Sequence, residues 1–417
     1  MSTGANTDPL FTTTTMTTSA RRTAHQAKPV ENSTTPALLP ARLVAVITGA
    51  NSGVGFGIAR RLLRRQFRFE TVDARGTPCH VVLDSDDDHD ENAPLHSADA
   101  FQPDVAVTVV LACRNLGRAE TARDALVAEF PGADVQTVIL DVSDRASIER
   151  AGDELRARFD QVTHLFCNAG IMPTVGLNWL AIMRDLVCDP YDLLTVATNA
   201  FVQPVGDRDR HGHGTVFMAN TAGHYVLIHE LMPLLTAGRG RVIFTSSYTA
   251  NREYFDPRDV ECLKGERPYQ SSKYAMDVLT VALNKRYGDR GVQFFTTCPG
   301  TVYTGIIAVP VPAFIMMAVY YFARLFIAML TITAENGSSA AVFLAHRPAN
   351  ELNVYHKYHA RASPLGTPFV ASHPVAPPPA EDGSGFSPQS LMEAMLVDGA
   401  CARIMEEERP DPEMSQA

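Results

Sequence analysis

The sequence lacks the marks of several protein classes. Its seven cysteines are odd in number and include no Cys-x-x-Cys pair, so we expect neither a disulfide framework nor a structural zinc site. It has no basic excess, because 46 acidic residues against 36 basic ones give a net charge of −10, which argues against a nucleic-acid partner. The first forty residues lack the apolar core of a secretory signal. The 46% of hydrophobic residues nevertheless predicts a globular chain with a sizeable core.

Both ends of the chain are poor in signals for regular structure. Residues 1–40 are rich in Thr, Ser and Pro, which form weak helices, so we predict a disordered tail there. The segment 363–417 predicts an irregular C-terminal extension with a short helix near 391–408. Between them, residues 41–362 form the predicted domain, which an acidic insertion interrupts at about 74–104.

Two short clusters have some features of metal sites but lack essential ligands. Alternate aspartates at 84–91 have the spacing of a calcium loop, but His89 stands where that loop needs glycine and no glutamate closes it. His211 and His213 do not stand within a recognisable set of carboxylate or thiol ligands, which is more typical of a solvated loop. We therefore predict no metal.

Apolar runs with the length of strands alternate with runs of helical spacing along the middle of the chain. The predicted strands are 42–48, 105–115, 135–140, 164–167, 241–246 and 292–298. The predicted helices are 56–64, 118–130, 146–159, 215–235, 268–287 and 334–345. This alternation predicts an α/β fold with a Rossmann-like, doubly wound parallel sheet in a single domain. In such sheets ligands bind at the carboxyl ends of the strands.

The segment TGANSGVG directly follows the first predicted strand and begins its helix. Glycines allow backbone amides to approach a pyrophosphate, and a helix N-terminus favours negative charge. A tight turn without a ligand is the alternative, but the position in the first strand–helix unit favours a dinucleotide. The predicted cofactor contacts in this segment are Gly49, Asn51, Ser52, Gly53, Val54 and Gly55.

The ends of the later strands indicate which dinucleotide binds. Arg114 follows the second strand, where an NAD site would have an acid, and its guanidinium suits the 2′-phosphate of NADPH; a surface arginine is the alternative. Asp141 follows the third strand, where it could accept from the adenine, and Asn168 follows the fourth, beside the cofactor. After the sixth strand, CPGTVYT could fold over the nicotinamide, which adds Val302 and Thr304 as predicted contacts.

The stretch RPYQSSKYAM places Tyr269 and Lys273 four residues apart. On a helix this spacing brings two side chains to one face. A cation beside a phenol favours the phenolate and lowers the phenol pKa, so the pair predicts a proton donor that works near neutral pH. A surface aromatic–cation pair is the alternative.

Together, TGANSGVG, CNAG, the serines at the end of the fifth strand, YQSSK and the PG turn resemble the short-chain dehydrogenase/reductase superfamily. The resemblance covers most of the predicted folded chain. It implies that Ser247, Tyr269 and Lys273 carry the reaction and that Asn220 completes a proton relay. Ser246 is the alternative to Ser247, which we prefer because the second serine of the pair is usually the catalytic one in that family.

The resemblance also implies a mechanism, in which hydride passes from NADPH to a carbonyl carbon. Ser247 and Tyr269 would hydrogen-bond the carbonyl oxygen, where negative charge develops, and Tyr269 would donate the proton. Lys273 would lower the pKa of the phenol and hold the nicotinamide ribose. Asn220 would position a water that connects Lys273 to solvent.

Three further segments look like the fungal 3-keto-steroid reductases: GLNWLAIMRDLVCDPYDLLT, TSSYTANREYFDPRDVECLKG and VYYFARLF. This likeness implies NADPH-dependent reduction of a 3-ketosterol to a 3β-hydroxysterol, in the C-4 demethylation of ergosterol-type biosynthesis. It also implies a place at the endoplasmic reticulum membrane or lipid droplets, with other sterol enzymes as partners. Another lipid or retinoid carbonyl reductase and a membrane scaffold are the alternatives; the presence of Tyr269 and Lys273 favours an enzyme over the scaffold.

The apolar segment at about 306–333 is long enough to cross a bilayer but is interrupted. Pro310 and Pro312 break its start, and Arg324 in its middle would cost about 2.5–3.5 kcal/mol at the bilayer centre. A single span would also separate the helix at 334–345 from its sheet. We therefore predict a monotopic contact with the cytosolic face of a membrane, which opens the pocket toward lipid. A buried lid without a membrane role is the alternative.

Overall fold

The computed structural model describes residues 42–64, 70–72, 78–79, 105–195, 197, 199–303, 313–375 and 388–407. The predictions for the tail at 1–40 and for most of the acidic insertion, including its calcium-like spacing, lie outside these residues.

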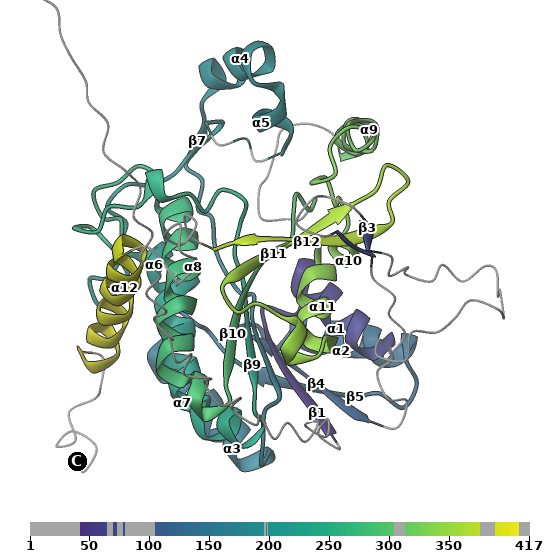
Figure 1. The fold of residues 1–417 in the computed structure, drawn as a ribbon, viewed down its shortest axis with the longest axis vertical. Coiled ribbons are helices and arrows are strands. Elements are labelled where there is room, and N and C mark those ends of the chain that lie inside the picture. The colour runs from purple at the N-terminus through teal and green to yellow at the C-terminus, as the bar shows by residue number, and fades with distance from the viewer. Residues whose placement is uncertain are drawn as a thin grey trace, which may run out of the picture. The chain divides into compact units, whose positions relative to one another are not determined.

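A single large sheet forms the centre of the described chain (Figure 1). Its strand order is β3-β2-β12-β11-β10-β9-β6-β1-β4-β5. The parallel strands are β1 (Arg42–Thr48), β4 (Ala106–Cys113), β5 (Asp134–Ile139), β6 (His164–Cys167), β9 (Arg241–Thr245), β10 (Gln293–Cys298) and β11 (His356–Ala362). Beyond β11 lie β12 (Pro368–Pro374), β2 (Glu70–Val72) and β3 (Pro78–Cys79).

Helices cover both faces of this sheet. Val44 and Val46 of β1 belong to a core cluster that includes residues of α3 (Arg145–Arg158), α7 (Gly223–Ala237) and α8 (Pro268–Tyr287). The alternate residues of β1 belong to a second cluster with α1 (Gly53–Arg64), α2 (Leu116–Glu129) and α11 (Ser339–His346). Because strand side chains alternate between faces, the continuous apolar run of β1 is buried on both sides. The predicted doubly wound, mostly parallel sheet is therefore confirmed.

The order of the strands creates the crevice in which such sheets bind ligands. Apart from β2 and β3, which lie at the opposite edge of the sheet, the chain continues from β1 outward through β4 and β5, and it then crosses back to β6 on the other side of β1. The carboxyl ends of β1 and β6 therefore meet at a topological switch point. The segments TGANSGVG and CNAG begin at these two strand ends.

The helix predicted at 215–235 is not uniform. The structure has α6 (Thr215–Phe217), a π-helical turn at Met218–Ala222, and then α7. The site candidate Asn220 lies in the middle of this π-turn. Such turns often occur at functional positions, and periodicity alone does not predict them.

The prediction of an irregular segment from 363 onward is wrong for residues 368–374. These residues form β12, which pairs antiparallel with β11. Prolines at both ends of β12 hide it in the sequence, and they are tolerated because Pro368 begins the strand and Pro374 ends it. The predicted helix near 391–408 is α12 (Pro388–Glu407), and its buried side chains extend the core over α8.

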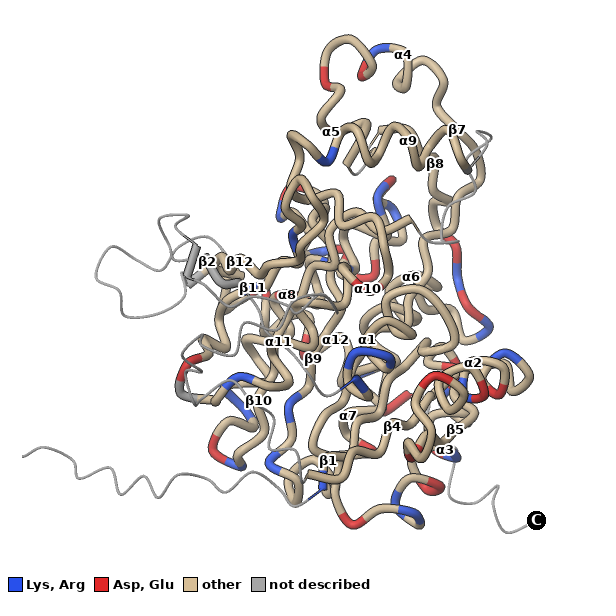
Figure 2. Tube along the Cα trace, turned by 90° about the vertical axis from the view of Figure 1, so that its right-hand side faces the viewer, with Lys and Arg blue, Asp and Glu red and all other residues tan. Residues whose placement is uncertain are grey.

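The long connections hold elements that the sequence pattern did not reveal. Between β6 and α6 lie β7 (Gly176–Leu177), α4 (Trp179–Cys188), α5 (Pro190–Thr195) and β8 (Phe201–Val202). The later connections hold α9 (Ala313–Ala323), α10 (Ala334–Gly337) and the short 3-10 turns Arg252–Tyr254, Gly288–Arg290 and Ala349–Glu351. Figure 1 shows α5 and α9 separated from one another above the strand ends, and α9 carries no charged residue (Figure 2).

Candidate active site

The turn after β1 depends on glycines at three positions, two for their backbone conformation and one for close packing. Gly49 and Gly53 have φ angles of +66° and +57°, which L side chains rarely adopt. A Cβ on Gly55 would lie 2.6 Å from the Asn168 amide nitrogen and 2.6 Å from the Gly49 carbonyl oxygen. The helix α1 begins at Gly53, so its N-terminus faces the turn. This geometry fits a dinucleotide pyrophosphate.

The ends of β1 and β6 are locked together beside this turn. The Thr48 hydroxyl accepts from the backbone nitrogens of Asn168 and Ala169, both at 2.9 Å. The Asn168 side chain donates to the Thr48 carbonyl at 3.0 Å, and its oxygen accepts from Thr245 of β9 at 3.3 Å. Asn168 thus ties three strand ends together beside the glycine turn, and its predicted contact with a cofactor stays a prediction.

The first two turns of α8 carry Tyr269 and Lys273. Pro268 occupies the first turn, where its missing N–H costs nothing, and the Tyr269 backbone nitrogen donates to the Gln203 side chain at 2.9 Å. The Lys273 ammonium lies 5.7 Å from the centre of the Tyr269 ring and donates to the Thr245 carbonyl at 2.7 Å. The spacing of four residues therefore places both side chains at the carboxyl end of β9, as expected on a helix.

The two serines that follow β9 point to different neighbours. The Ser247 hydroxyl lies near Tyr269 and hydrogen-bonds with the Thr249 hydroxyl at 3.0 Å, whereas Ser246 is buried and its hydroxyl lies 3.4 Å from the Lys273 carbonyl oxygen. Ser246 also stabilises the charged form of Asp277 on the core side of α8. The structure thus brings Ser247, and not Ser246, to the phenol. The catalytic role of Ser247 stays a prediction.

The predicted low pKa of the phenol is wrong in its direction. Burial raises the pKa of Tyr269 to about 12, although the nearby Ser247 hydroxyl opposes this increase. Burial also lowers the pKa of Lys273 to about 8, against the attraction of Asp277. Desolvation is therefore the largest influence on both pKa values, while the ammonium donates to the Thr245 carbonyl. At neutral pH the phenol holds its proton, which is the form that a proton donor needs.

Asn220 uses its side chain to hold the segment after β6. Its oxygen accepts from the Ile171 backbone nitrogen at 2.7 Å, and its nitrogen donates to the Ile171 carbonyl at 3.1 Å and to the Ser272 hydroxyl at 3.0 Å. The space is tight, since a Cβ on Gly170 would lie 2.9 Å from Asn220 and 3.5 Å from the Lys273 nitrogen. Asn220 is thus close to Lys273, and its role in a proton relay stays a prediction.

The remaining predicted cofactor contacts lie around the same sheet edge. Arg114 is exposed directly after β4, the neighbour of β1. The Asp141 carboxylate follows β5 and accepts from the Ser143 backbone at 2.9 Å and hydroxyl at 2.6 Å. Val302 forms an isolated bridge with Ile332. Thr304 lies outside the described residues, and the cofactor contacts of the others stay predictions.

The two candidate histidines of the RHGHG loop point to different partners. His211 accepts from the Arg210 guanidinium, whereas His213 lies 3.7 Å from a Glu261 oxygen and 3.8 Å from a Glu407 oxygen. The sequence distance hid both carboxylates. Among the described residues, no group of three His, Cys, Asp or Glu side chains could hold a metal ion.

His224 is a buried residue of the site that the sequence did not single out. Its Nε2 lies 3.0 Å from the Thr48 hydroxyl and its Nδ1 lies 3.2 Å from the Asn220 carbonyl oxygen. Burial lowers the pKa of His224 to about 4, so it is neutral at pH 7, and its Nδ1 donates while its Nε2 accepts. Its position four residues after Asn220 is the one sequence signal that could have revealed this bridge.

Comparison with known proteins agrees with this geometry. The family model "short chain dehydrogenase" matches residues 192–309. The chain is 35% identical over 336 residues to the 3-keto-steroid reductase/17-beta-hydroxysteroid dehydrogenase 7 of Rattus norvegicus, covering 79% of this chain and 89% of that protein. The Homo sapiens protein of the same name is 34% identical, with 79% and 87% covered.

A fungal relative shows the same likeness over a shorter stretch. The 3-keto-steroid reductase erg27 of Schizosaccharomyces pombe is 33% identical over 245 residues, covering 58% of this chain and 63% of that protein. The first two relatives are covered almost over their full length. The chain is therefore an oxidoreductase of the short-chain dehydrogenase/reductase superfamily and belongs, within it, to the family of the 3-keto-steroid reductases.

Proposed function

We propose that this enzyme reduces a 3-ketosterol to a 3β-hydroxysterol with NADPH, in the C-4 demethylation of ergosterol-type sterol biosynthesis. The single observation that carries the chemistry is the grouping of the Tyr269 phenol with Ser247 and with Lys273, whose ammonium lies 5.7 Å from the centre of the phenol ring. The names of the relatives support the steroid ketone as substrate class. The crevice at the carboxyl ends of β1 and β6 supports the dinucleotide.

The residues of the site divide the work of carbonyl reduction. Ser247 and Tyr269 donate hydrogen bonds to the carbonyl oxygen, where negative charge develops. Tyr269 then gives its proton to that oxygen, and Lys273 stabilises the negative charge left near the phenol. The bound nicotinamide supplies the hydride. Asn220 keeps the segment after β6 in place next to Lys273.

NADPH as the preferred cofactor rests on Arg114. The exposed guanidinium stands at the end of β4, next to the β1 turn whose glycines fit a pyrophosphate. No acid occupies the position directly after β4, where ribose recognition in NAD sites would use one. Charge-assisted hydrogen bonds between guanidinium and phosphate would favour the 2′-phosphate.

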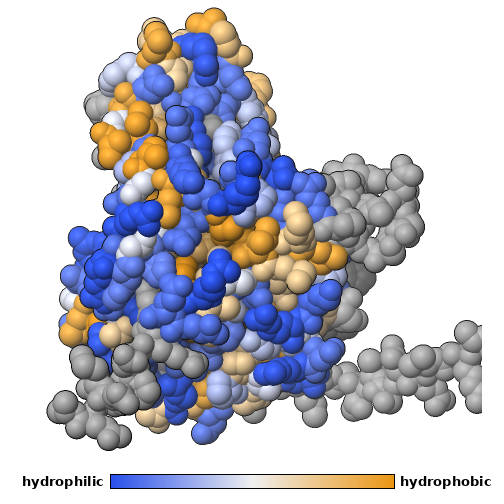
Figure 3. All heavy atoms as spheres, turned by 90° about the vertical axis from the view of Figure 1, so that its left-hand side faces the viewer, coloured by the Kyte–Doolittle hydropathy of each residue, from blue (hydrophilic) through white to orange (hydrophobic). Residues whose placement is uncertain are grey.

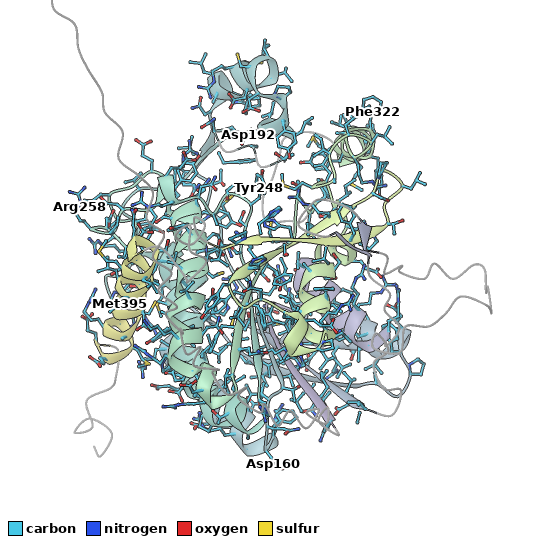
Figure 4. All side chains as sticks on the ribbon, viewed as in Figure 1. Asp160, Asp192, Tyr248, Arg258, Phe322 and Met395 are labelled. Atoms are coloured by element: carbon cyan, nitrogen blue, oxygen red, sulfur yellow. The ribbon has the colours of Figure 1, made fainter. Side chains whose placement is uncertain are left out.

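The elements above the sheet edge suit an apolar substrate. Leu194 of α5 packs with Met317 and Tyr320 of α9 against buried Leu330 and Ile332. Figure 4 shows Tyr248, which follows Ser247, between the strand ends and α5. A sterol that enters between α5 and α9 would therefore keep its ring system among apolar side chains while its ketone reaches Ser247 and Tyr269.

We propose further that this face rests on the cytosolic side of the endoplasmic reticulum membrane or a lipid droplet, next to other sterol enzymes. Among the described residues, no helix has both the length and the apolar content to cross a bilayer. On α9 and the turn after it, Phe314, Phe322 and Phe326 are 75%, 67% and 78% exposed. A second group of exposed hydrophobic side chains lies on α4, and Figure 3 shows hydrophobic surface at the top of the molecule. The members of this group are Trp179, Leu180, Met183, Leu186 and Val187.

Flotation with phospholipid vesicles tests the membrane contact. A variant with Phe314→Ser, Phe322→Ser and Phe326→Ser should stay with the soluble fraction, because it removes exposed apolar area without touching the core. The matched control is Met392→Ser with Met395→Ser, two exposed residues of α12, which should float like the parent protein. Unchanged flotation of the triple variant would refute a membrane role for α9.

Substrate comparison tests the reaction itself. Purified protein in mild detergent is given NADPH and either a 4-methyl-3-ketosterol, retinal or a simple ketone. We expect NADPH consumption with the sterone and a 3β-alcohol as product. Turnover of retinal or the simple ketone alone would keep the reductase and reject the sterol, and NADPH binding without any turnover would favour a scaffold.

A further inference from the structure

A buried ion pair lies behind the Ser247–Tyr269–Lys273 group. The Lys357 ammonium of β11 is 2.7 Å from an Asp277 carboxylate oxygen of α8, and both side chains are less than one-tenth exposed. The sequence gives no hint of this pair, because its members are eighty residues apart. A buried ion pair is weak evidence for stability, since desolvation of the two charges offsets their attraction.

Two ammonium groups hold the end of β9 from different elements. Lys273 of α8 donates to the Thr245 carbonyl at 2.7 Å. Lys357 of β11 donates to the Ser247 carbonyl at 2.5 Å. Between them, the Ser246 backbone nitrogen donates to Thr297 of β10 at 2.7 Å. The hydrogen bond from Lys357 therefore helps to fix the backbone of Ser247, which is also held in place by the strand that precedes it.

Asp277 connects the two lysines electrostatically. It follows Lys273 by four residues on α8, so it lies one turn away on the same face. Its charge raises the pKa of Lys273, whereas the charge of Lys357 lowers it. The other groups that interact with Lys273 are Tyr269 on α8, Cys298 on β10 and His224 on α7.

We propose that Lys357 and Asp277 are positioning residues of the reductase reaction, which fix the Ser247 backbone and balance the charge around Lys273. This inference rests on the proposed function, because Ser247 and Lys273 matter only if they act on a carbonyl. Lys357 does not contact the reacting atoms itself; it acts through the carbonyl of Ser247 and through Asp277. Their burial explains why no solvent-exposed lysine could replace Lys357.

The two single variants should shift the pH dependence in opposite directions. Lys357→Met leaves Asp277 to act on Lys273 alone, so the fall in kcat at high pH should move to higher pH. Asp277→Asn leaves the Lys357 charge without its partner, so the fall should move to lower pH. If the two residues gave structural support alone, both variants would lose activity, but their pH profiles would not shift in opposite directions. Exposed residues of the same region, Lys285→Met and Asp289→Asn, serve as controls and should show the parent profile.

The double variant Asp277→Asn with Lys357→Met removes both charges, so neither is left buried without its partner. It should fold even if a single variant does not, and its pH profile should return close to that of the parent. Its kcat should still fall about tenfold, because Ser247 loses the donor to its carbonyl. A double variant with parental kcat would overturn the positioning role, as would equal shifts in folded single variants.

A measurement without substrate separates this inference from the proposed function. Acetic anhydride labels an amine only in its neutral form, so labelling of Lys273 across pH, measured by mass spectrometry, reports its protonation directly. Opposite shifts in the two single variants would support the charge balance even if no sterone were turned over. If the parent reduces the sterone but Lys273 labels identically in all folded variants, only the charge balance fails.

Discussion

Lys273 lies one helical turn after Tyr269, and its ammonium is bonded to the Thr245 carbonyl at 2.7 Å while it stays 5.7 Å from the centre of the phenol ring. The cation is therefore anchored to the strand end and acts on the phenol through space. This arrangement explains why burial dominates the protonation of both groups. Both remain in the protonated form near pH 7, which suits reduction better than oxidation.

The rate of reduction should fall as the pH rises through about 8. Burial lowers the pKa of Lys273 to about 8, so its positive charge is present below that pH and is lost above it. Tyr269, with its pKa raised to about 12, keeps its proton throughout this range. A pH profile of kcat/KM between 6 and 10 checks this, and a flat profile up to pH 10 would contradict it.

Ser247→Ala should lower kcat/KM about 10²- to 10³-fold, because it removes one donor to the developing oxyanion. Ser246→Ala is the matched control, since the Ser246 hydroxyl faces α8 and Asp277 and not the phenol. It should lower kcat/KM less than about tenfold. If Ser246→Ala proved the more damaging change, the assignment of Ser247 would be wrong.

Arg114→Asp should raise the KM for NADPH about 10- to 100-fold, the loss expected for hydrogen bonds to a charged group. The KM for NADH should change much less, because NADH has no 2′-phosphate. Arg118→Asp, at another exposed arginine nearby on α2, controls for the general loss of positive charge. Equal effects of Arg114→Asp on both cofactors would refute a phosphate contact.

Acid should destabilise the fold through its buried histidines. Burial lowers the pKa of both His224 and His346 to about 4, whereas an unfolded histidine titrates near 6.5. Below about 6.5 the unfolded chain thus binds more protons, so the free energy of unfolding should decrease as the pH falls from 6.5 toward 4.

Denaturant unfolding at several pH values measures this decrease. His224→Gln should make it smaller, whereas His211→Gln, at an exposed position, should leave it unchanged. A parental pH dependence in His224→Gln would mean that His224 does not resist protonation in the folded protein.

The sequence pattern was most informative where local signals agree. The bounds 42–48, 164–167 and 268–287 match β1, β6 and α8, because buried parallel strands are continuous apolar runs and Pro268 begins a long helix. Asn168, Tyr269 and Lys273 lie at a strand end or on the first two turns of a helix, so the topology alone brings them to one edge. The sequence thus predicted correctly where these two strands, this helix and these three residues lie in the fold.

The features that the sequence did not reveal depend on contacts between distant segments. The direction of the Tyr269 pKa depends on burial that several elements create together. The Lys357–Asp277 pair joins β11 to α8, and β12 exists only because β11 offers it an edge. The π-turn around Asn220 has no periodic signature, since it occupies a single turn inside a helical run.

The most direct test of the central claim compares Tyr269→Phe with Tyr274→Phe, using NADPH and a 4-methyl-3-ketosterol. Both variants remove one phenol oxygen from α8, but the Tyr274 hydroxyl donates to Glu393 of α12 at 2.7 Å, away from the site. The account predicts that Tyr269→Phe loses 3β-alcohol formation by at least about 10²-fold while Tyr274→Phe keeps it. Full turnover in folded Tyr269→Phe would contradict the account.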